Sequence, residues 1–387
     1  MTTNFEHQHQ MKPGGVKGNI DNHQTPTLLH WLPTVFLLAV VGLGAVSVLT
    51  QSAVRSWPTG KSLITGEAQA EFEKKNLDAN VPWRVPSVAL WGGLNYRLFG
   101  EARDGAVIGQ NGWLFTTEEF QTAPEDAAEI RGKLSYIREV RDELAKSGAK
   151  LVVALIPAKT RLYAGELGST RQPAVWQPVY QEFRHGLEQA GIPAPDLEAA
   201  LRKAAKPGYE VFLHTDTHWT PFGAVVAAQT LTPVVRKLAP ELPAATYAAT
   251  YAAAQKPVTA RRGDLLRYVP APDGSGPAPD QVQELTYTRA DASGGGLLGG
   301  DSLAVTLVGT SYSAETAENV WHFGGALSRA LGAEVLNAAQ AGKGPTVPMR
   351  EYLKGKDRQE NPPKVVIWEI PERFLRVPYP EKQQPKS

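Results

Sequence analysis

The segment Leu303-Ala-Val-Thr-Leu-Val308 leads directly into Gly309-Thr-Ser311-Tyr-Ser313, and apolar residues then recur with helical spacing from Ala314 to Leu331. A short run rich in β-branched residues predicts a buried strand, and the periodic residues after it predict a helix. Ser311 is therefore expected on a strand-to-helix turn, where a side chain is exposed at the carboxyl end of a strand.

The same pattern of strands and helices continues on both sides of this turn. Residues Glu125 to Ser147 and Pro178 to Ala190 have the apolar spacing of helices, and Leu151 to Ile156 form an apolar run typical of a buried strand. From about residue 101 the chain is therefore predicted to have an α/β fold.

A second segment, His214-Thr-Asp216-Thr-His218-Trp219, supplies the groups that a serine nucleophile needs. A serine hydroxyl attacks well near neutral pH only when a base lies within hydrogen-bond reach and a third group orients that base. Thr220-Pro221 has the signature of a helix start, which places His218 in the loop before a helix. We predict Ser311 as nucleophile, His218 as base and Asp216 as the carboxylate that orients it.

Two other interpretations of these residues remain open at this stage. Ser311 or Ser313 can simply cap the helix that follows. His214, Asp216 and His218 alternate along one extended face and are all competent metal ligands. Because the chain has no cysteine and no second ligand cluster stands nearby in the sequence, we predict neither a metal nor a cofactor.

Six short motifs, taken together and in this order, resemble the AlgJ/AlgX family of polysaccharide O-acetyltransferases. The motifs are Gly109 to Phe115, Ile156 to Tyr163, Asp216 to Trp219, Gly263 to Leu265, Gly309 to Ser313 and Trp368 to Arg373. The catalytic domain of that family is a circularly permuted SGNH hydrolase. The resemblance implies an SGNH-hydrolase-like, three-layer α/β/α domain with a parallel sheet.

The order of the strand-like segments fits such a permutation. In ordinary SGNH hydrolases the serine block comes first and the Asp-x-x-His block last, whereas here the order is reversed and the spacing is Asp-x-His. After the Ser311 strand, Ala333 to Asn337 resembles the second SGNH strand and Lys364 to Trp368 the third. The fourth, Lys150 to Ile156, comes before the histidine block instead.

The chain also contains Gly300-Asp-Ser302-Leu303, the literal string that names the GDSL enzymes. Ser302 precedes the strand-like run Ala304 to Val308, whereas the nucleophile of such a domain follows its strand. We therefore assign the nucleophile to Ser311.

The resemblance implies that Ser311, His218 and Asp216 form the triad and that the Ser311 amide helps to bind the oxyanion. For a second donor, the stretch from Asn337 to Gly344 offers the amide of Ala339 or Gly342. At the third block, Trp368 to Arg373 stands where Gly-x-Asn-Asp would be expected, so no third donor is assigned.

Five further residues are candidates for substrate binding. Lys159 and Arg161 follow a strand end, where they can contact sugar hydroxyls or uronate carboxylates, or only the solvent at a helix end. Trp219 and Tyr312 flank the base and the nucleophile, and they can stack on a sugar ring or pack in the core. Arg373 can contact substrate, or pair with Glu369 or Glu372 as part of the scaffold.

Composition limits the other possibilities. The 387 residues are 42% hydrophobic with a formal net charge of +1, which fits one large domain with appendages. No basic run suggests a nucleic-acid partner.

Residues 32 to 49 form a run without charged residues that is long enough for a membrane helix, with a core helix as the alternative. We predict a disordered cytoplasmic tail (1–27), a transmembrane anchor (28–50), a juxtamembrane linker (51–100), the SGNH-like domain (101–380) and a tail (381–387). The resemblance decides the orientation: a single pass through the inner membrane, with the catalytic domain in the periplasm.

The resemblance further implies an extracytoplasmic O-acetyltransferase that works through acetyl-Ser311 and esterifies hydroxyls of an exopolysaccharide. It also implies a membrane partner of the MBOAT type that exports the acetyl group. Two alternatives remain: a carbohydrate acetylesterase with the same triad, and a non-catalytic envelope scaffold that binds glycan.

Overall fold

The protein is described by a computed structural model, which covers residues 27–50, 60, 62, 64–74, 83–242, 251–289, 303–360 and 362–377. The chain divides into two compact units, residues 1–87 and 88–387, which are treated separately below. The predicted tail at 381–387, all but the last residue of the tail at 1–27, and Ser302 lie outside the described residues.

The first unit contains α1 (Thr27–Leu49) and α2 (Glu67–Phe72). Large apolar side chains along α1 are exposed, among them Trp31, Phe36 and Leu43. Nevertheless, no helix in the described part of the chain meets the combined length and apolarity needed to cross a membrane. The membrane span at 28–50 therefore stays a prediction.

The second unit is built on a four-stranded sheet in the order β3-β10-β8-β9. Its strands are β3 (Lys150–Ile156), β8 (Val305–Val308), β9 (Val335–Asn337) and β10 (Val365–Pro371). All neighbouring pairs are parallel, which confirms the predicted α/β fold. In the numbering of SGNH hydrolases, β3 corresponds to the fourth strand, β10 to the third, β8 to the first and β9 to the second. This spatial order is part of a doubly wound sheet, although the fourth strand comes earliest in this chain.

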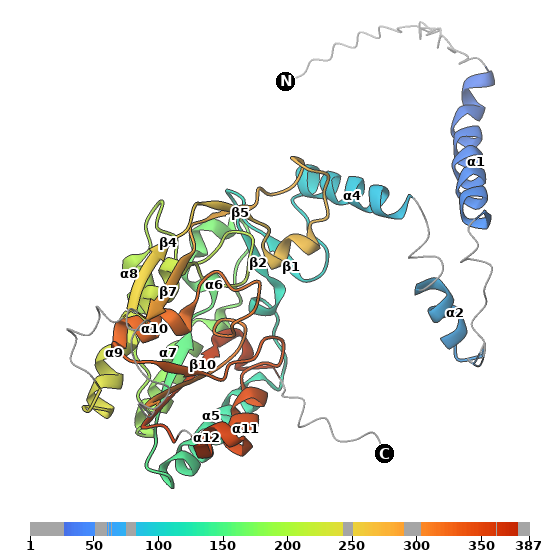
Figure 1. Ribbon diagram of the computed structural model, residues 1–387. Coiled ribbons are helices and arrows are strands. Elements are labelled where there is room, and N and C mark those ends of the chain that lie inside the picture. The colour runs from blue at the N-terminus through green and yellow to red at the C-terminus, as the bar shows by residue number, and fades with distance from the viewer. Residues whose placement is uncertain are drawn as a thin grey trace, which may run out of the picture. The chain divides into compact units, whose positions relative to one another are not determined.

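Helices cover both faces of this sheet (Figure 1). Because successive strand residues point to opposite faces, Val152 and Ala154 of β3 enter one hydrophobic cluster, and Leu151 and Val153 enter another. The first cluster includes residues of α8 (Leu197–Ala204), α9 (Pro221–Leu238) and α10 (Phe323–Leu331). The second includes residues of α5 (Asp126–Ala145), α7 (Val179–Gln189) and α11 (Thr346–Lys354).

Other helices and strands are shorter or peripheral to the sheet, although Phe115 and Val282 belong to the first hydrophobic cluster. These elements are α4 (Arg84–Leu94), α6 (Lys159–Leu162), α12 (Lys356–Glu360) and the antiparallel pairs β1 (Ala106–Ile108) with β2 (Leu114–Thr116), β4 (Tyr251–Gln255) with β7 (Leu285–Arg289), and β5 (Thr259–Arg261) with β6 (Asp280–Val282).

One predicted boundary is wrong. The helix expected from Ala314 begins only at Phe323, because Asn319 organises the preceding residues as a loop. Its side-chain amide donates to the Ala314 carbonyl, and its side-chain oxygen accepts from the amides of Trp321 and His322. Local side-chain bonds of this kind compete with helix formation.

Candidate active site

The turn after β8 places Ser311 at the carboxyl end of the sheet, where its side chain is half-buried. Glu369 of β10 fixes this turn through two hydrogen bonds: it accepts from the Thr310 amide at 2.7 Å and from Ser313 Oγ at 3.0 Å. A Cβ at Gly309 would lie 2.4 Å from Glu369 Oε2, so only glycine fits there. Neither serine caps α10, whose first residue follows His322.

His218 reaches both the nucleophile and a carboxylate. Its Nε2 lies 2.7 Å from Ser311 Oγ, and its Nδ1 lies 2.6 Å from Asp216 Oδ1. The loop that carries it ends as predicted, with Thr220 capping α9 by accepting from the Gly223 amide, and Pro221 at the first helical position. The structure therefore brings the three predicted residues together in the order that activates a serine hydroxyl.

Asp216 is fully buried yet remains ionised. Burial alone would raise its pKa, but the hydrogen bonds from the His218 ring and amide, with the charge of Arg261, hold the pKa well below its ordinary value. The guanidinium of Arg261 lies 3.4 Å from Asp216 Oδ2, and the Asp264 amide donates to the same oxygen at 3.2 Å. A buried carboxylate with these partners can stabilise the imidazolium that forms when His218 accepts a proton.

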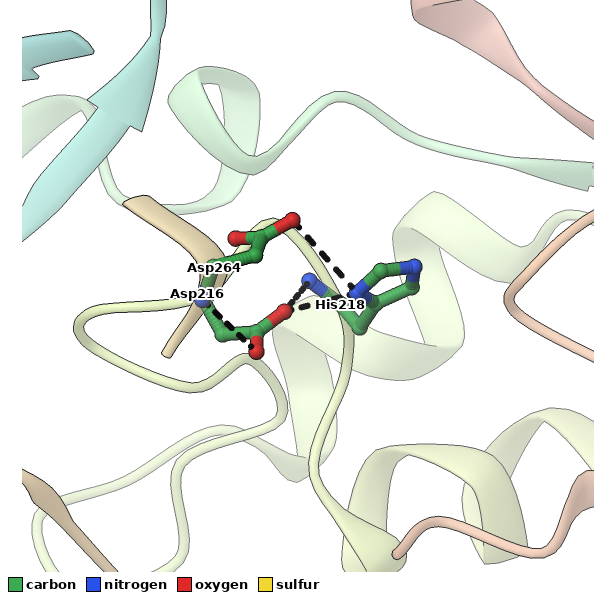
Figure 2. A group of neighbouring side chains, drawn as sticks. All are labelled: Asp216, His218 and Asp264. Carbon is green, nitrogen blue, oxygen red and sulfur yellow. Dashed lines mark hydrogen bonds and ion pairs between the residues drawn. The ribbon is translucent and has the colours of Figure 1, made fainter. Parts of the chain in front are cut away.

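A second carboxylate, Asp264, lies beside the pair (Figure 2). Its oxygens accept from the Thr217 amide at 2.8 Å and the Thr217 hydroxyl at 2.7 Å, and Oδ2 lies 4.0 Å from His218 Nδ1. Asp264 belongs to the family motif Gly263 to Leu265, but the sequence assigned it no role. Only the fold shows that it lies next to Asp216.

Ligand atoms of Asp216, His218 and Asp264 lie close enough together to hold a metal ion. His214, the third ligand of the predicted metal alternative, is not part of this group; its ring instead lies 4.1 Å from that of Trp113. The distance of 2.6 Å between His218 Nδ1 and Asp216 Oδ1 is that of a direct hydrogen bond, and Arg261 already supplies positive charge to Asp216. The contacts therefore favour a hydrogen-bonded triad over a metal centre.

Trp321 was missed by the sequence analysis. Its ring stacks on the His218 imidazole, with centroids 4.4 Å apart and an interplanar angle of 12°. Trp321 reaches this position because the loop held by Asn319 replaces the expected helix, so helical periodicity could not have indicated it.

Lys159 is buried in the core, where neither of its two predicted roles, sugar contact and helix-end solvation, fits. Its ammonium group donates to the carbonyls of Leu114 at 2.6 Å, His214 at 2.9 Å and Asp216 at 3.0 Å. Burial lowers its pKa to about 8, although the charges of Asp280 and Glu119 oppose the shift. Lys159 thus fastens the histidine loop to β2.

Arg161 is also part of the scaffold rather than of an open surface. Its guanidinium pairs with Glu372 at 2.6 Å and donates to the carbonyls of Trp176 and Gln177. Its side chain is 7% exposed, which leaves little of it for a sugar.

The aromatic neighbours of the triad pack inward. Trp219 is fully buried and Tyr312 is 2% exposed, so packing rather than sugar stacking describes both. The Tyr312 hydroxyl donates to the Thr217 carbonyl at 2.5 Å, which ties the nucleophile turn to the histidine loop.

The two candidates for a second oxyanion donor differ in their surroundings. The Ala339 amide already donates to Asn337 Oδ1 at 3.1 Å. Gly342 is exposed, in a turn with φ of +77° that favours glycine. The Ser311 amide, in contrast to those of Thr310 and Ser313, has no acceptor among the described residues.

Glu369 provides a prediction about stability. Burial raises its pKa to about 7 from the ordinary 4.5, and the hydrogen bonds from Thr310 and Ser313 oppose that rise only partly. The folded protein therefore binds this proton more tightly than the unfolded chain, so the stability gained below about pH 4.5 is lost as the pH rises through about 7. Across that window we expect the free energy of unfolding to fall by up to about 3 kcal/mol more in the wild type than in Glu369→Gln.

Urea unfolding of both proteins at a series of pH values measures this difference. Glutamine keeps the acceptor for the Thr310 amide but does not titrate. The exposed Glu139→Gln on α5 is the control and should follow the wild type. Parallel pH profiles for the wild type and Glu369→Gln would show that Glu369 titrates as an ordinary carboxyl group.

Comparisons with known proteins agree with one another: the family model, the related sequences and the solved structure are all named as AlgX or AlgJ proteins. Residues 106–372 match the family model described as an SGNH hydrolase-like domain, acetyltransferase AlgX. A probable alginate O-acetylase AlgJ from Azotobacter vinelandii is 38% identical over 323 residues, covering 82% of this chain and 81% of the relative. The protein of the same name from Pseudomonas aeruginosa is 39% identical over 352 residues, covering 88% and 86%. The solved O-acetyltransferase domain of Pseudomonas putida AlgJ is 37% identical, with a TM-score of 0.63 over 73% of this chain and 96% of that one.

Proposed function

This chain belongs to the AlgX family of SGNH hydrolase-like acetyltransferases and is an O-acetyltransferase, and from this premise we propose that Ser311, His218 and Asp216 carry the transfer. The observation that supports the assignment most directly is the continuous hydrogen-bonded series from Ser311 Oγ through His218 to Asp216, with separations of 2.7 and 2.6 Å.

The first half-reaction loads the enzyme. Ser311 Oγ attacks the carbonyl carbon of an acetyl donor while His218 Nε2 takes the hydroxyl proton. The tetrahedral intermediate collapses, the bond to the leaving group breaks, and His218 returns the proton to that group. The Ser311 amide is oriented by the turn that Glu369 holds, and it donates to the developing oxyanion.

The second half-reaction transfers the acetyl group from Ser311 to the sugar. A sugar hydroxyl attacks acetyl-Ser311 and gives its proton to His218 Nε2. Collapse of this intermediate breaks the bond to Ser311 Oγ, which regains the proton. Asp216, held ionised, stabilises the imidazolium in both steps.

The acceptor is an alginate-type polysaccharide in this proposal, because relatives that match more than four fifths of the chain are named as alginate O-acetylases. We further propose that α1 anchors the chain in the inner membrane by a single pass, with the second unit in the periplasm. The exposed apolar side chains of α1 support this placement. Since acetyl-CoA is not expected in that compartment, the donor would reach Ser311 through an MBOAT-type membrane exporter, as the family resemblance implies.

The test incubates the full chain in detergent with an activated acetate ester and a panel of oligosaccharides, followed by mass spectrometry of the sugars. We expect an ester-linked acetyl group on a uronate oligosaccharide. Release of acetate with every sugar unchanged would favour the acetylesterase, and absence of any ester turnover would favour the non-catalytic scaffold.

A further inference from the structure

A cavity of about 570 Å³ lies on the Asp216 side of the triad. Its volume is within the range of about 300–1,000 Å³ that is usual for small-molecule sites. Among its lining residues are Asp104, Glu118, Thr217, Asp264, Arg267 and Arg373. Thr217 directly precedes His218, and the Asp264 amide donates to Asp216, so the cavity borders the catalytic loop.

Arg373 is unusual among the buried arginines near this cavity. Its side chain is 9% exposed, yet it donates no hydrogen bond to any residue that the structure describes. Its buried Nε has no hydrogen-bond partner, which is also true of Arg376, but Arg376 donates through another nitrogen. Arg161, by contrast, donates to Glu372 and two carbonyls, and Arg376 donates to the Glu118 carbonyl and to Gln121.

The nearest acid does not satisfy the Arg373 guanidinium. Glu118 Oε2 lies 3.5 Å from Nε, and the Glu118 side chain is 44% exposed, so this pair is loose. Arginine stays charged in proteins, and burying unsatisfied donors costs free energy. The charges of Glu118, Glu119 and Asp264 act on Arg373, but none of these carboxylates accepts a hydrogen bond from it among the described residues, so its donors remain open to an anionic ligand.

Aromatic rings hold the guanidinium beside the nucleophile turn. Its central carbon lies 5.6 Å from the ring centroid of Tyr312 and 5.0 Å from that of Phe374. Tyr312 follows Ser311 in the sequence. These are cation–π distances, and a guanidinium that lies over aromatic rings can still bind a carboxylate through two parallel hydrogen bonds.

We propose that this cavity is a subsite for a uronate residue of the acceptor polymer, whose carboxylate binds Arg373 while a neighbouring sugar presents its hydroxyl to acetyl-Ser311. The inference rests on the proposed function. Arg267 adds a second positive charge, and the acidic groups of Asp104 and Glu118 are acceptors for sugar hydroxyls. A neutral polymer would leave Arg373 with only its loose pair to Glu118, so the site discriminates in favour of acidic chains.

The experiment compares acetyl transfer by the full chain in detergent to mannuronate oligosaccharides and to carboxyl-reduced oligosaccharides of the same length. For the wild type we expect kcat/KM to be roughly 10- to 100-fold higher with the acidic acceptor. Arg373→Gln should remove most of that preference, mainly by raising KM for the acidic acceptor, and Arg373→Lys should restore part of it. The control Arg329→Gln removes a charge next to a different cavity and should keep the preference.

Two results would overturn the subsite. One is equal use of both acceptors by the wild type. The other is an equal loss with both acceptors in Arg373→Gln, matched by the same loss of ester turnover, because Arg373 would then act only through the Ser311 turn. If the wild type transfers acetyl to neither sugar, the proposed function fails. The subsite is then tested by the binding affinity of the oligosaccharide alone. Weaker binding of the mannuronate oligosaccharide to Arg373→Gln would support it, and unchanged binding would contradict it.

Discussion

Ser311→Ala is expected to lower acetyl transfer by a factor on the order of 10⁴ or more while the protein stays folded. The reason is that Ser311 Oγ is the atom that forms the acetyl-enzyme, and removing it leaves only binding and oxyanion stabilisation. The side chain is half-buried and hydrogen-bonds only to His218 among the described residues, so its loss should cost little stability. Initial rates of sugar acetylation and thermal unfolding of the same preparation measure the two effects.

Ser313→Ala is the matched control in the same turn. Its hydroxyl donates to Glu369 at 3.0 Å and makes no contact with His218 among the described residues. We expect a loss of less than about 10-fold, because the change loosens the turn but keeps the nucleophile. A larger loss in Ser313→Ala than in Ser311→Ala would move the nucleophile to Ser313 and contradict the assignment.

Asp216→Asn is expected to lower kcat by roughly 10³- to 10⁴-fold. The amide is nearly isosteric with the carboxylate, but it can no longer stabilise the imidazolium, and its NH₂ group favours the wrong His218 tautomer. Because the wild-type carboxyl has a strongly lowered pKa, it stays ionised across the neutral range. The loss in kcat should therefore persist over that range, which a pH–rate profile of the variant measures.

Asp264→Asn serves as the comparison for this second prediction. Asp264 lies 4.0 Å from His218 Nδ1, whereas Asp216 lies at 2.6 Å, and both Asp264 oxygens are occupied by Thr217. We expect a decrease at least about 10-fold smaller than that of Asp216→Asn. Equal decreases would mean that the two carboxylates share the role of orienting the base, or that both hold a metal ion. Metal analysis of the purified chain would distinguish these two cases.

Local patterns in the sequence were sufficient for the parts of the fold that short-range rules control. The apolar run before Gly309 became β8, and Thr220-Pro221 became the start of α9. The order of motifs also indicated the permuted sheet, in which β3 lies beside β10 although more than 200 residues separate them in the chain. The strand and the helix start follow from hydrophobic periodicity and capping, which act over a few residues, whereas the permuted order followed from the resemblance to the family.

The environment of the site could not be derived in the same way. The sequence contains the pattern Lys159-Thr-Arg161 after a strand, but only the fold shows that Lys159 is surrounded by three carbonyls and Arg161 by Glu372. Charged side chains are usually exposed, so a surface role was the natural prediction. Trp321 and Asp264 reach the triad through long-range contacts that no local spacing encodes.

Peptide mapping by mass spectrometry tests the central claim most directly. The full-length protein is quenched shortly after mixing with an activated acetate ester, digested, and searched for an added acetyl group. We predict one acetyl group on the peptide that contains Ser311, formed before the sugar product and lost when the oligosaccharide is added. An acetyl group on any other residue, or transfer to sugar without acetylation of Ser311, would contradict it.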